Sequence, residues 1–332
     1  MASIMQDKDW EAYGYIVDAL GVVSIDTKQG TDSTLTISNV APSITASTVG
    51  LYDTDESGDM TLTASQAETT GFKVKFTVTD KNSCLNSSAG DEITSAAINV
   101  RRSGIAAGSC LASGDYDAND CYPDASAWNP SCTQTGTCGG SGDDTIEWTC
   151  TFPLQYHADP TVADSTYAAE NWLADAKATD DDTADTGWNT ATIGTEMGQF
   201  MSYDLNTASI AYGSLDPGAD AAEQSTVLEA TGNVGLDETL YGTDMTSGGD
   251  TILVGQQKYN LTASQGWGGS GSTTLLATPG AEAELNLAKT TTTGTPATKS
   301  TYWVLRVPDP QATGTYSGTN TIEGKVSEYA GW

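Results

Sequence analysis

One segment alternates between apolar and polar residues so regularly that it predicts a β-strand. From Phe72 to Thr79 the apolar side chains occupy every second position, with Lys and Thr between them. A period of two places one set on a buried face and the other in solvent. The same pattern recurs at 96–100 and 145–152. Many short segments of this kind between turn residues predict an all-β fold of antiparallel sandwiches.

A tryptophan-containing sequence occurs twice and divides the chain. In 9–18 and again in 171–180, a Trp is followed by Ala two residues later and by Asp eight residues later. A polar linker and new strand-like sequence follow each copy, so we interpret each copy as the last strand of a sandwich. The predicted organisation is an N-terminal strand and linker (1–40), followed by two tandem Ig-like sandwiches (41–190 and 191–332).

The charge of the chain excludes several classes of partner. Asp and Glu number 44 against 13 Lys and Arg, which gives a net charge of -31. Nucleic acid and anionic lipid would be repelled, whereas divalent cations would be attracted. No apolar run approaches the roughly 18 residues of a membrane span. The first seven residues lack the features of a signal peptide, which indicates a removed signal or a piece of a longer protein.

All six cysteines lie in the first predicted sandwich, four of them in a long polar insertion at about 103–144. An even number confined to one unit indicates disulfides and an oxidising, extracellular compartment. A zinc site is the alternative, but the closest pair is spaced more widely than in zinc knuckles. Several connectivities remain open. The expected one pairs Cys110 with Cys121, Cys132 with Cys138, and Cys84 with Cys150.

Two acidic segments are candidate calcium sites. The first resembles the start of a calcium loop, with oxygen ligands at alternate positions and Gly58 at the bend, but Ala64 stands where such loops need Glu. Its candidate ligands are Asp53, Asp55, Ser57 and Asp59. The second is an acidic cluster, Asp115, Asp117 and Asp120. The alternative for both is an ordinary solvated turn in an acidic protein.

No catalytic signature is present. His157 is the only histidine, and the sequence at 268–272 departs from a nucleophile elbow because Ser272 replaces its last Gly. Acidic residues are abundant, but no pair stands out as the carboxylates of a glycosidase. We therefore expect the chain not to be an enzyme.

Some loop residues are candidates for binding or modification. Trp128 and Trp267 lie in Gly-, Asn- and Ser-rich sequence, where exposed rings could stack on glycans or on a protein, or cap the end of a sandwich. Asn86 and Asn260 match the N-glycosylation pattern, which is short and often occurs by chance.

Three motifs in the C-terminal half resemble a known group of proteins. They are an entry strand with its turn at 212–218, a Thr-Gly-Asn turn at 231–234, and a closing hairpin at 307–318 that contains Gly-Thr-Tyr-Ser-Gly. Together they resemble tandem Ig-like modules of bacterial and archaeal cell-surface proteins. The resemblance covers about 196–330 well and 40–182 only through general strand patterning. It implies spacers, adhesive units or surface-layer building blocks, and no reaction.

The sequence thus predicts an extracellular or cell-surface protein that is structural or adhesive. By the tryptophan repeat, residues 8–38 are the last strand and linker of a sandwich whose other strands are missing from the chain. Such a strand could fold back, remain loose, or add to a sheet edge of another copy, which builds a filament or surface layer. A carbohydrate-binding surface module is the alternative, and accessory domains of a secreted hydrolase are a third interpretation.

Overall fold

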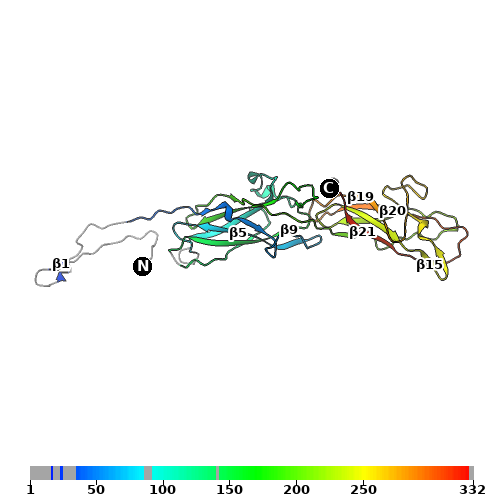
Figure 1. The fold of residues 1–332 in the computed structure, drawn as a ribbon, viewed down its shortest axis with the longest axis horizontal. Helices are drawn as coiled ribbons and strands as arrows, with labels where there is room; N and C mark the ends of the chain where they lie inside the picture. Colours follow the sequence, from blue (N-terminus) through cyan, green and yellow to red (C-terminus); the bar gives the residue numbers. More distant parts are fainter. Residues whose placement is uncertain (1–15, 18–22, 25–34, 86–91, 140–141, 329–332) are drawn as a thin grey trace.

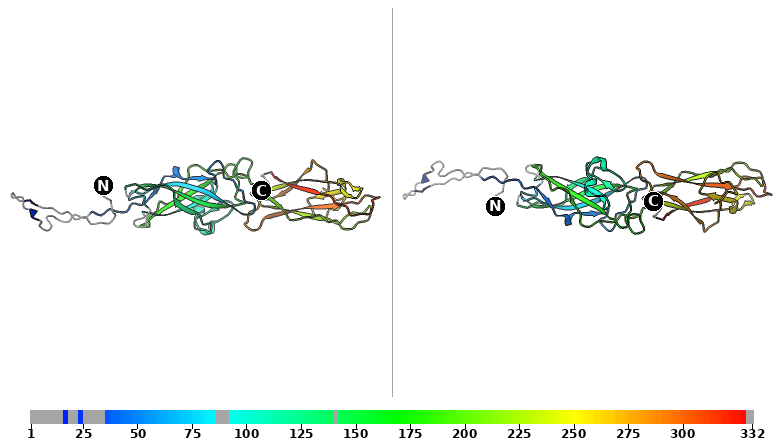
Figure 2. Two further views of the ribbon diagram at one scale, coloured as in Figure 1. Left: turned by 90° about the horizontal axis from the view of Figure 1, so that it is seen from below. Right: turned by 90° about the horizontal axis from the view of Figure 1, so that it is seen from above.

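The computed structural model describes residues 16–17, 23–24, 35–85, 92–139 and 142–328. Its regular structure is almost entirely β-strand, which confirms the all-β prediction, and it forms two sandwiches that follow one another along the long axis of the molecule (Figures 1 and 2). Ahead of them, β1 (Ile16–Val17) pairs antiparallel with β2 (Val23–Ser24). The remainder of the predicted N-terminal strand, 8–26, lies outside the described residues.

Two antiparallel sheets form the first sandwich, and the strongly alternating segments are central strands, two in one sheet and one in the other. One sheet has the order β3 (Ser43–Ile44), β5 (Glu68–Thr79), β9 (Thr145–Gln155) and β8 (Ser131–Gln134), with β4 (Gly50–Tyr52) also paired to β5. The other has the order β11 (Asn189–Thr190), β10 (Trp172–Asp180), β6 (Ile93–Arg102) and β7 (Cys121–Tyr122).

The core of the first sandwich is one continuous cluster. The apolar positions of β5 are at most 1% exposed, and Trp172 of β10 is fully buried. Each such side chain contributes about 1.5–3 kcal/mol by leaving water. The predicted insertion at 103–144 is part of this framework, because its strands β7 and β8 pair with β6 and β9. Residues 191–200 also belong here, since Met197 bridges to Met60.

The second sandwich has one five-stranded and one three-stranded antiparallel sheet. The larger has the order β12 (Tyr203–Leu205), β13 (Gln224–Ala230), β20 (Ala297–Leu305), β17 (Gln257–Asn260) and β18 (Thr273–Thr274). The smaller has the order β19 (Ala281–Leu287), β14 (Leu236–Gly242) and β21 (Asn320–Val326). A hairpin of β15 (Met245–Ser247) and β16 (Asp250–Ile252) lies at the far end (Figure 1).

The core of the second sandwich is divided. Its buried apolar residues fall into three small clusters, around Leu236, around Trp303 and around Leu305, rather than into one. Half-buried apolar side chains from irregular segments border these clusters. The buried apolar contacts of this unit are therefore not continuous as they are in the first.

Helical structure among the described residues is limited to short 3-10 turns. They are η1 (Ala46–Thr48), η2 (Ala107–Ser109), η3 (Ser113–Asp115) and η4 (Val254–Gln256). Within the described part of the chain, no helix has the length and apolar character that crossing a membrane requires.

Candidate functional site

All six cysteines form disulfides, in the pairs Cys84–Cys138, Cys110–Cys121 and Cys132–Cys150. The predicted disulfide formation and the Cys110–Cys121 pair are confirmed, but the other two expected pairs were wrong. The reason lies in the sheet, because β8 pairs with β9 in a register that sets Cys132 directly opposite Cys150. Cys84 is thereby left for Cys138. Disulfides of this kind persist in oxidising compartments.

The first acidic loop uses its candidate ligands within its own turn. Asp55 Oδ1 accepts hydrogen bonds from Ser57 N and Ser57 Oγ, both 2.9 Å long, and these lower the pKa of Asp55. Asp53 Oδ1 accepts one from Thr61 N at 3.2 Å, whereas Asp59 is exposed. These contacts describe a self-stabilised turn, and calcium binding in it stays a prediction.

The second acidic cluster is spread over different partners. Asp115 Oδ2 accepts hydrogen bonds from two backbone N–H groups of its own turn, which lower the pKa of Asp115. Asp117 Oδ1 accepts two from Asn119. Asp120 forms an ion pair with Arg102 at 3.2 Å. The three carboxylates therefore hold separate parts of the insertion in place.

The candidate binding residues are only partly available. Trp128 is 7% exposed and belongs to the first core, where its Nε1 donates a hydrogen bond to Pro153 O. Trp267 is half-buried, with the cations of Lys258 and Arg306 over its ring at 4.5 and 5.1 Å. Asn260 is also buried and donates from Nδ2 to Ser270 O, while Asn86 lies outside the described residues.

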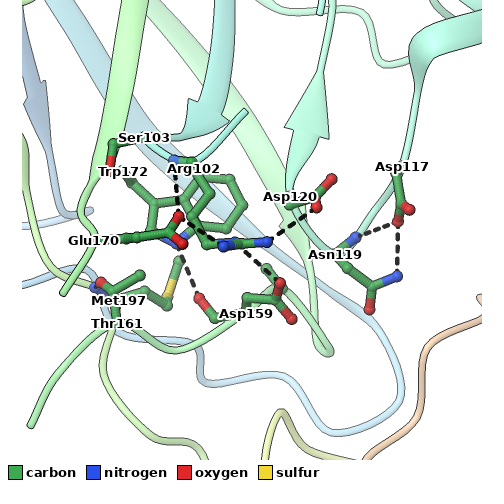
Figure 3. A network of polar contacts seen from close by, with 12 residues as sticks. Arg102, Ser103, Asp117, Asn119, Asp120, Asp159, Thr161, Glu170, Trp172 and Met197 are labelled. Atoms are coloured by element: carbon green, nitrogen blue, oxygen red, sulfur yellow. Dashed lines mark hydrogen bonds and ion pairs between the residues drawn. The ribbon is translucent and has the colours of Figure 1, made fainter. Parts of the chain in front are cut away.

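A buried polar network joins the two sandwiches. Figure 3 shows the guanidinium of Arg102 between three carboxylates, those of Asp120, Asp159 and Glu170. Asp159 also pairs with Lys289 of the second sandwich, with 2.9 Å between Oδ1 and Nζ. Both partners are buried, so each charge depends on the other for its stability.

The Thr-Gly-Asn turn identified in the sequence belongs to the same junction. Asn233 is fully buried and donates from Nδ2 to Ala158 O and Gly198 O at 3.1 and 3.0 Å. Its Oδ1 accepts a hydrogen bond from Phe200 N. Gly232 lies against the segment around Phe200 that connects the two sandwiches, which we call the linker. A Cβ atom on Gly232 would stand 2.0 Å from Phe200 O. This turn therefore clamps the linker against both units.

His157 belongs to this junction as well. It is fully buried, with Nε2 3.1 Å from Thr293 Oγ1 and Nδ1 3.2 Å from Asn119 Oδ1. Burial, together with the nearby charge of Lys289, lowers the pKa of His157 to about 4. At neutral pH the imidazole is uncharged and holds the first sandwich to the second.

An open groove along the second sandwich is the strongest candidate for a binding site. Two adjoining cavities of about 710 and 310 Å³ share Ile210, Tyr212 and Met245 in their walls. Further lining comes from Leu215, Ile252 and Tyr316. We call this the distal groove. Apart from Ile252, which is 3% exposed, these side chains are half-buried.

Two features leave backbone groups unpaired beside the distal groove. The strand β21 is at the edge of the smaller sheet and is hydrogen-bonded to β14 alone. Across the groove, the described segment 206–219 contains no strand residue, although the Tyr212 hydroxyl anchors it to Gln257 Oε1 at 3.1 Å. The Tyr203 ring of β12 covers β21 at Gly324, whereas Asn320 and Ile322 of β21 line the smaller cavity. The edge of β21 is therefore open for an added strand along the groove only.

No protein-family model and no curated protein matches the chain. The solved structures that are similar to it include two complexes. A chaperone–tip adhesin complex of CFA/I fimbriae biogenesis is 10% identical at a TM-score of 0.31, and the match covers 86% of this chain and 84% of that one. The chaperone–tip adhesion subunit pre-assembly complex of archaic chaperone-usher Csu pili of Acinetobacter baumannii is 9% identical at a TM-score of 0.30, covering 86% of this chain and 100% of that one. Neither likeness bears on the function proposed below, which comes from the geometry of the distal groove.

Proposed function

We propose that this protein is a structural subunit of an extracellular assembly, built when a segment of one copy adds as a strand to the distal groove of the next. The open groove beside the unpaired edge of β21 carries this proposal. The function is mechanical and involves no reaction. The three disulfides support an oxidising compartment outside the cytosol.

The proposed occupant is the segment 8–26 of a second copy. Its sequence has the strand pattern the groove needs, with Tyr13, Tyr15 and Val17 at alternate positions. Within the described residues, β1 and β2 of this segment pair only with each other. An isolated two-stranded pairing is marginal in water, so addition to a larger sheet would stabilise it.

Strand addition fits both halves of the groove. Backbone N–H and C=O groups of an incoming strand would pair with the free edge of β21, and alternate side chains would enter the two cavities. A fully buried side chain of this size contributes about 1.5–3 kcal/mol. Three such side chains contribute about 4.5–9 kcal/mol against an association cost of about 4–15 kcal/mol, so the backbone hydrogen bonds to β21 must supply the remainder of a stable contact.

The assembly itself provides the first test. Light scattering and negative-stain images of the full chain are expected to show oligomers that grow with protein concentration. Deletion of residues 1–38 should leave a folded monomer. A synthetic peptide of residues 8–26 should then bind that monomer and raise its melting temperature by binding linkage. A strictly monomeric parent, or a deletion that assembles as well as the parent, would refute the proposal.

A pair of matched substitutions tests the groove. Met245→Arg places a charge in the cavity and should abolish peptide binding. The fold should be retained, because Met245 lies in the β15–β16 hairpin and is only half-buried. Ile193→Arg is the control, since Ile193 is 79% exposed on the first sandwich. Equal loss of binding in both variants would indicate a general effect of charge rather than an occupied groove.

A further inference from the structure

Three carboxylates converge at the end of the smaller sheet of the second sandwich. They are Asp237 on β14, Glu284 on β19 and Glu328 just after β21. One carboxylate oxygen from each lies within 4.8 Å of the others. The three residues come from three adjacent strands, so the pairing of the sheet is what brings them together.

A bulge in β19 shapes this cluster. Between the rungs Leu236–Leu287 and Glu238–Ala283, three residues of β19 stand against Asp237 alone. Asn286, within the bulge, has a positive φ of 51°, which is uncommon for a residue other than glycine. The distortion brings Asn286 N to 2.6 Å from Asp237 Oδ1, where it donates a hydrogen bond. The backbone therefore orients the Asp237 carboxylate.

The second oxygen of Asp237 is an independent indication of a ligand. Asp237 is only 1% exposed, yet its Oδ2 has no hydrogen-bond partner. A buried charged oxygen without a partner costs free energy that a hydrogen bond or a cation must offset. Burial raises the pKa of Asp237, and the charge of Glu328 raises it further. The pKa of Glu284 is raised as well, first by Glu328 and then by Asp237.

Among the residues that the structure describes, no cation forms an ion pair with these three groups. Lys325 stands opposite Asp237 in the sheet and its charge offsets part of the repulsion, but its Nζ is paired with Glu282. Mutual repulsion among the three carboxylates therefore remains, and an added divalent cation would relieve it. Two of the three residues, Glu284 and Glu328, are exposed, so an ion has access from solvent and can keep water ligands.

We infer that Asp237, Glu284 and Glu328 form a calcium site that ties the ends of β14, β19 and β21 together. Calcium takes oxygen ligands at about 2.3–2.6 Å in flexible geometry, so oxygens on opposite sides of one ion stand roughly 4.6–5.2 Å apart. All three oxygens lie within 4.8 Å of one another, so none is too far from the others to share one such ion. Magnesium requires shorter distances and stricter octahedral geometry, which an exposed and bulged sheet edge does not supply.

Calorimetric titration of the full chain with calcium chloride tests the site. The buffer contains 150 mM sodium chloride, about physiological ionic strength, which limits diffuse binding of calcium to the acidic surface. Asp237→Asn and Glu284→Gln should each weaken calcium binding at least about tenfold, since each removes a charged ligand. Glu323→Gln is the matched control, because Glu323 lies on β21 outside the cluster and bonds to the Tyr241 hydroxyl. It should change affinity less than about twofold.

The alternative outcomes are separable. If calcium binds but only Asp55→Ala weakens it, the ion occupies the first acidic loop and the inference is overturned. If neither Asp237→Asn nor Glu284→Gln lowers the affinity, or if magnesium binds as tightly as calcium, the inference also fails. Glu284→Gln changes an exposed residue, so loss of folding does not explain its result. The titration does not depend on assembly, and its outcome is independent of the proposed function.

Discussion

Protonation of His157 is expected to loosen the junction between the two sandwiches. The pKa of this buried imidazole is lowered from 6.5 to about 4. Below pH 6.5 the imidazole is protonated in the unfolded chain but not in the folded chain. The free energy of unfolding therefore decreases as pH is lowered, until about pH 4, where the imidazole is protonated in both states. From these two pKa values the loss at pH 5 relative to pH 8 is about 2 kcal/mol, and below pH 4 about 3 kcal/mol.

Other groups titrate in the opposite sense, so the measurement must isolate His157. Burial, followed by the charge of Asp181, raises the pKa of Glu92 to about 7, and burial raises that of Glu238 to about 6. These carboxyls bind protons more tightly in the folded state than in the unfolded state. Their contribution to the free energy of unfolding is therefore present at low pH and is lost as pH rises through those pKa values. Their contribution is common to the parent and a His157 variant, and it cancels in the difference between them.

Urea denaturation of the parent and of His157→Gln at pH 5 and pH 8 gives that difference. Glutamine cannot titrate, and its amide can still bond to Thr293. The variant should therefore lose less stability than the parent between the two pH values, by about 2 kcal/mol. A difference between the two proteins that is the same at both pH values would refute the assignment of a neutral, buried imidazole to the junction.

Three further predictions concern single contacts. Replacing both Cys84 and Cys138 by Ala should cost about 4 kcal/mol in urea denaturation, because this disulfide closes a loop with a sequence separation of 54. Lys289→Met removes the interdomain partner of Asp159, which keeps its ion pair with Arg102, and should destabilise the fold by about 1.5–3 kcal/mol in the same assay. Gly232→Ala adds a Cβ against backbone and should expose the linker, seen as faster proteolysis near residue 200; an unchanged rate would argue against a clamped linker.

Local patterns in the sequence predicted strands well and contacts between distant strands poorly. The alternation at 72–79 and 145–152 corresponds to β5 and β9, because period-two burial is a property of each strand alone. The pairing of Cys132 with Cys150 depends on the register of β8 against β9, which no spacing of cysteines encodes. Trp128 was placed in a loop by its neighbours, yet the insertion folds back and buries it.

The candidate sites follow the same rule. The predicted acidic loops were contiguous in sequence, whereas Asp237, Glu284 and Glu328 are brought together by sheet pairing and a bulge. The distal groove is likewise a property of the assembled second sandwich.

The placement of the disulfides gives the two sandwiches different responses to a pulling force. All six cysteines lie in the first sandwich, so its loops stay closed even when its strands separate. The second sandwich has no covalent cross-link, and stretching 203–326 to a straight chain would release roughly 400 Å, at about 3.4 Å per residue. Under tension the disulfides shorten the first sandwich's maximal extension between 84 and 150, so the second sandwich would lengthen more for each residue that unfolds.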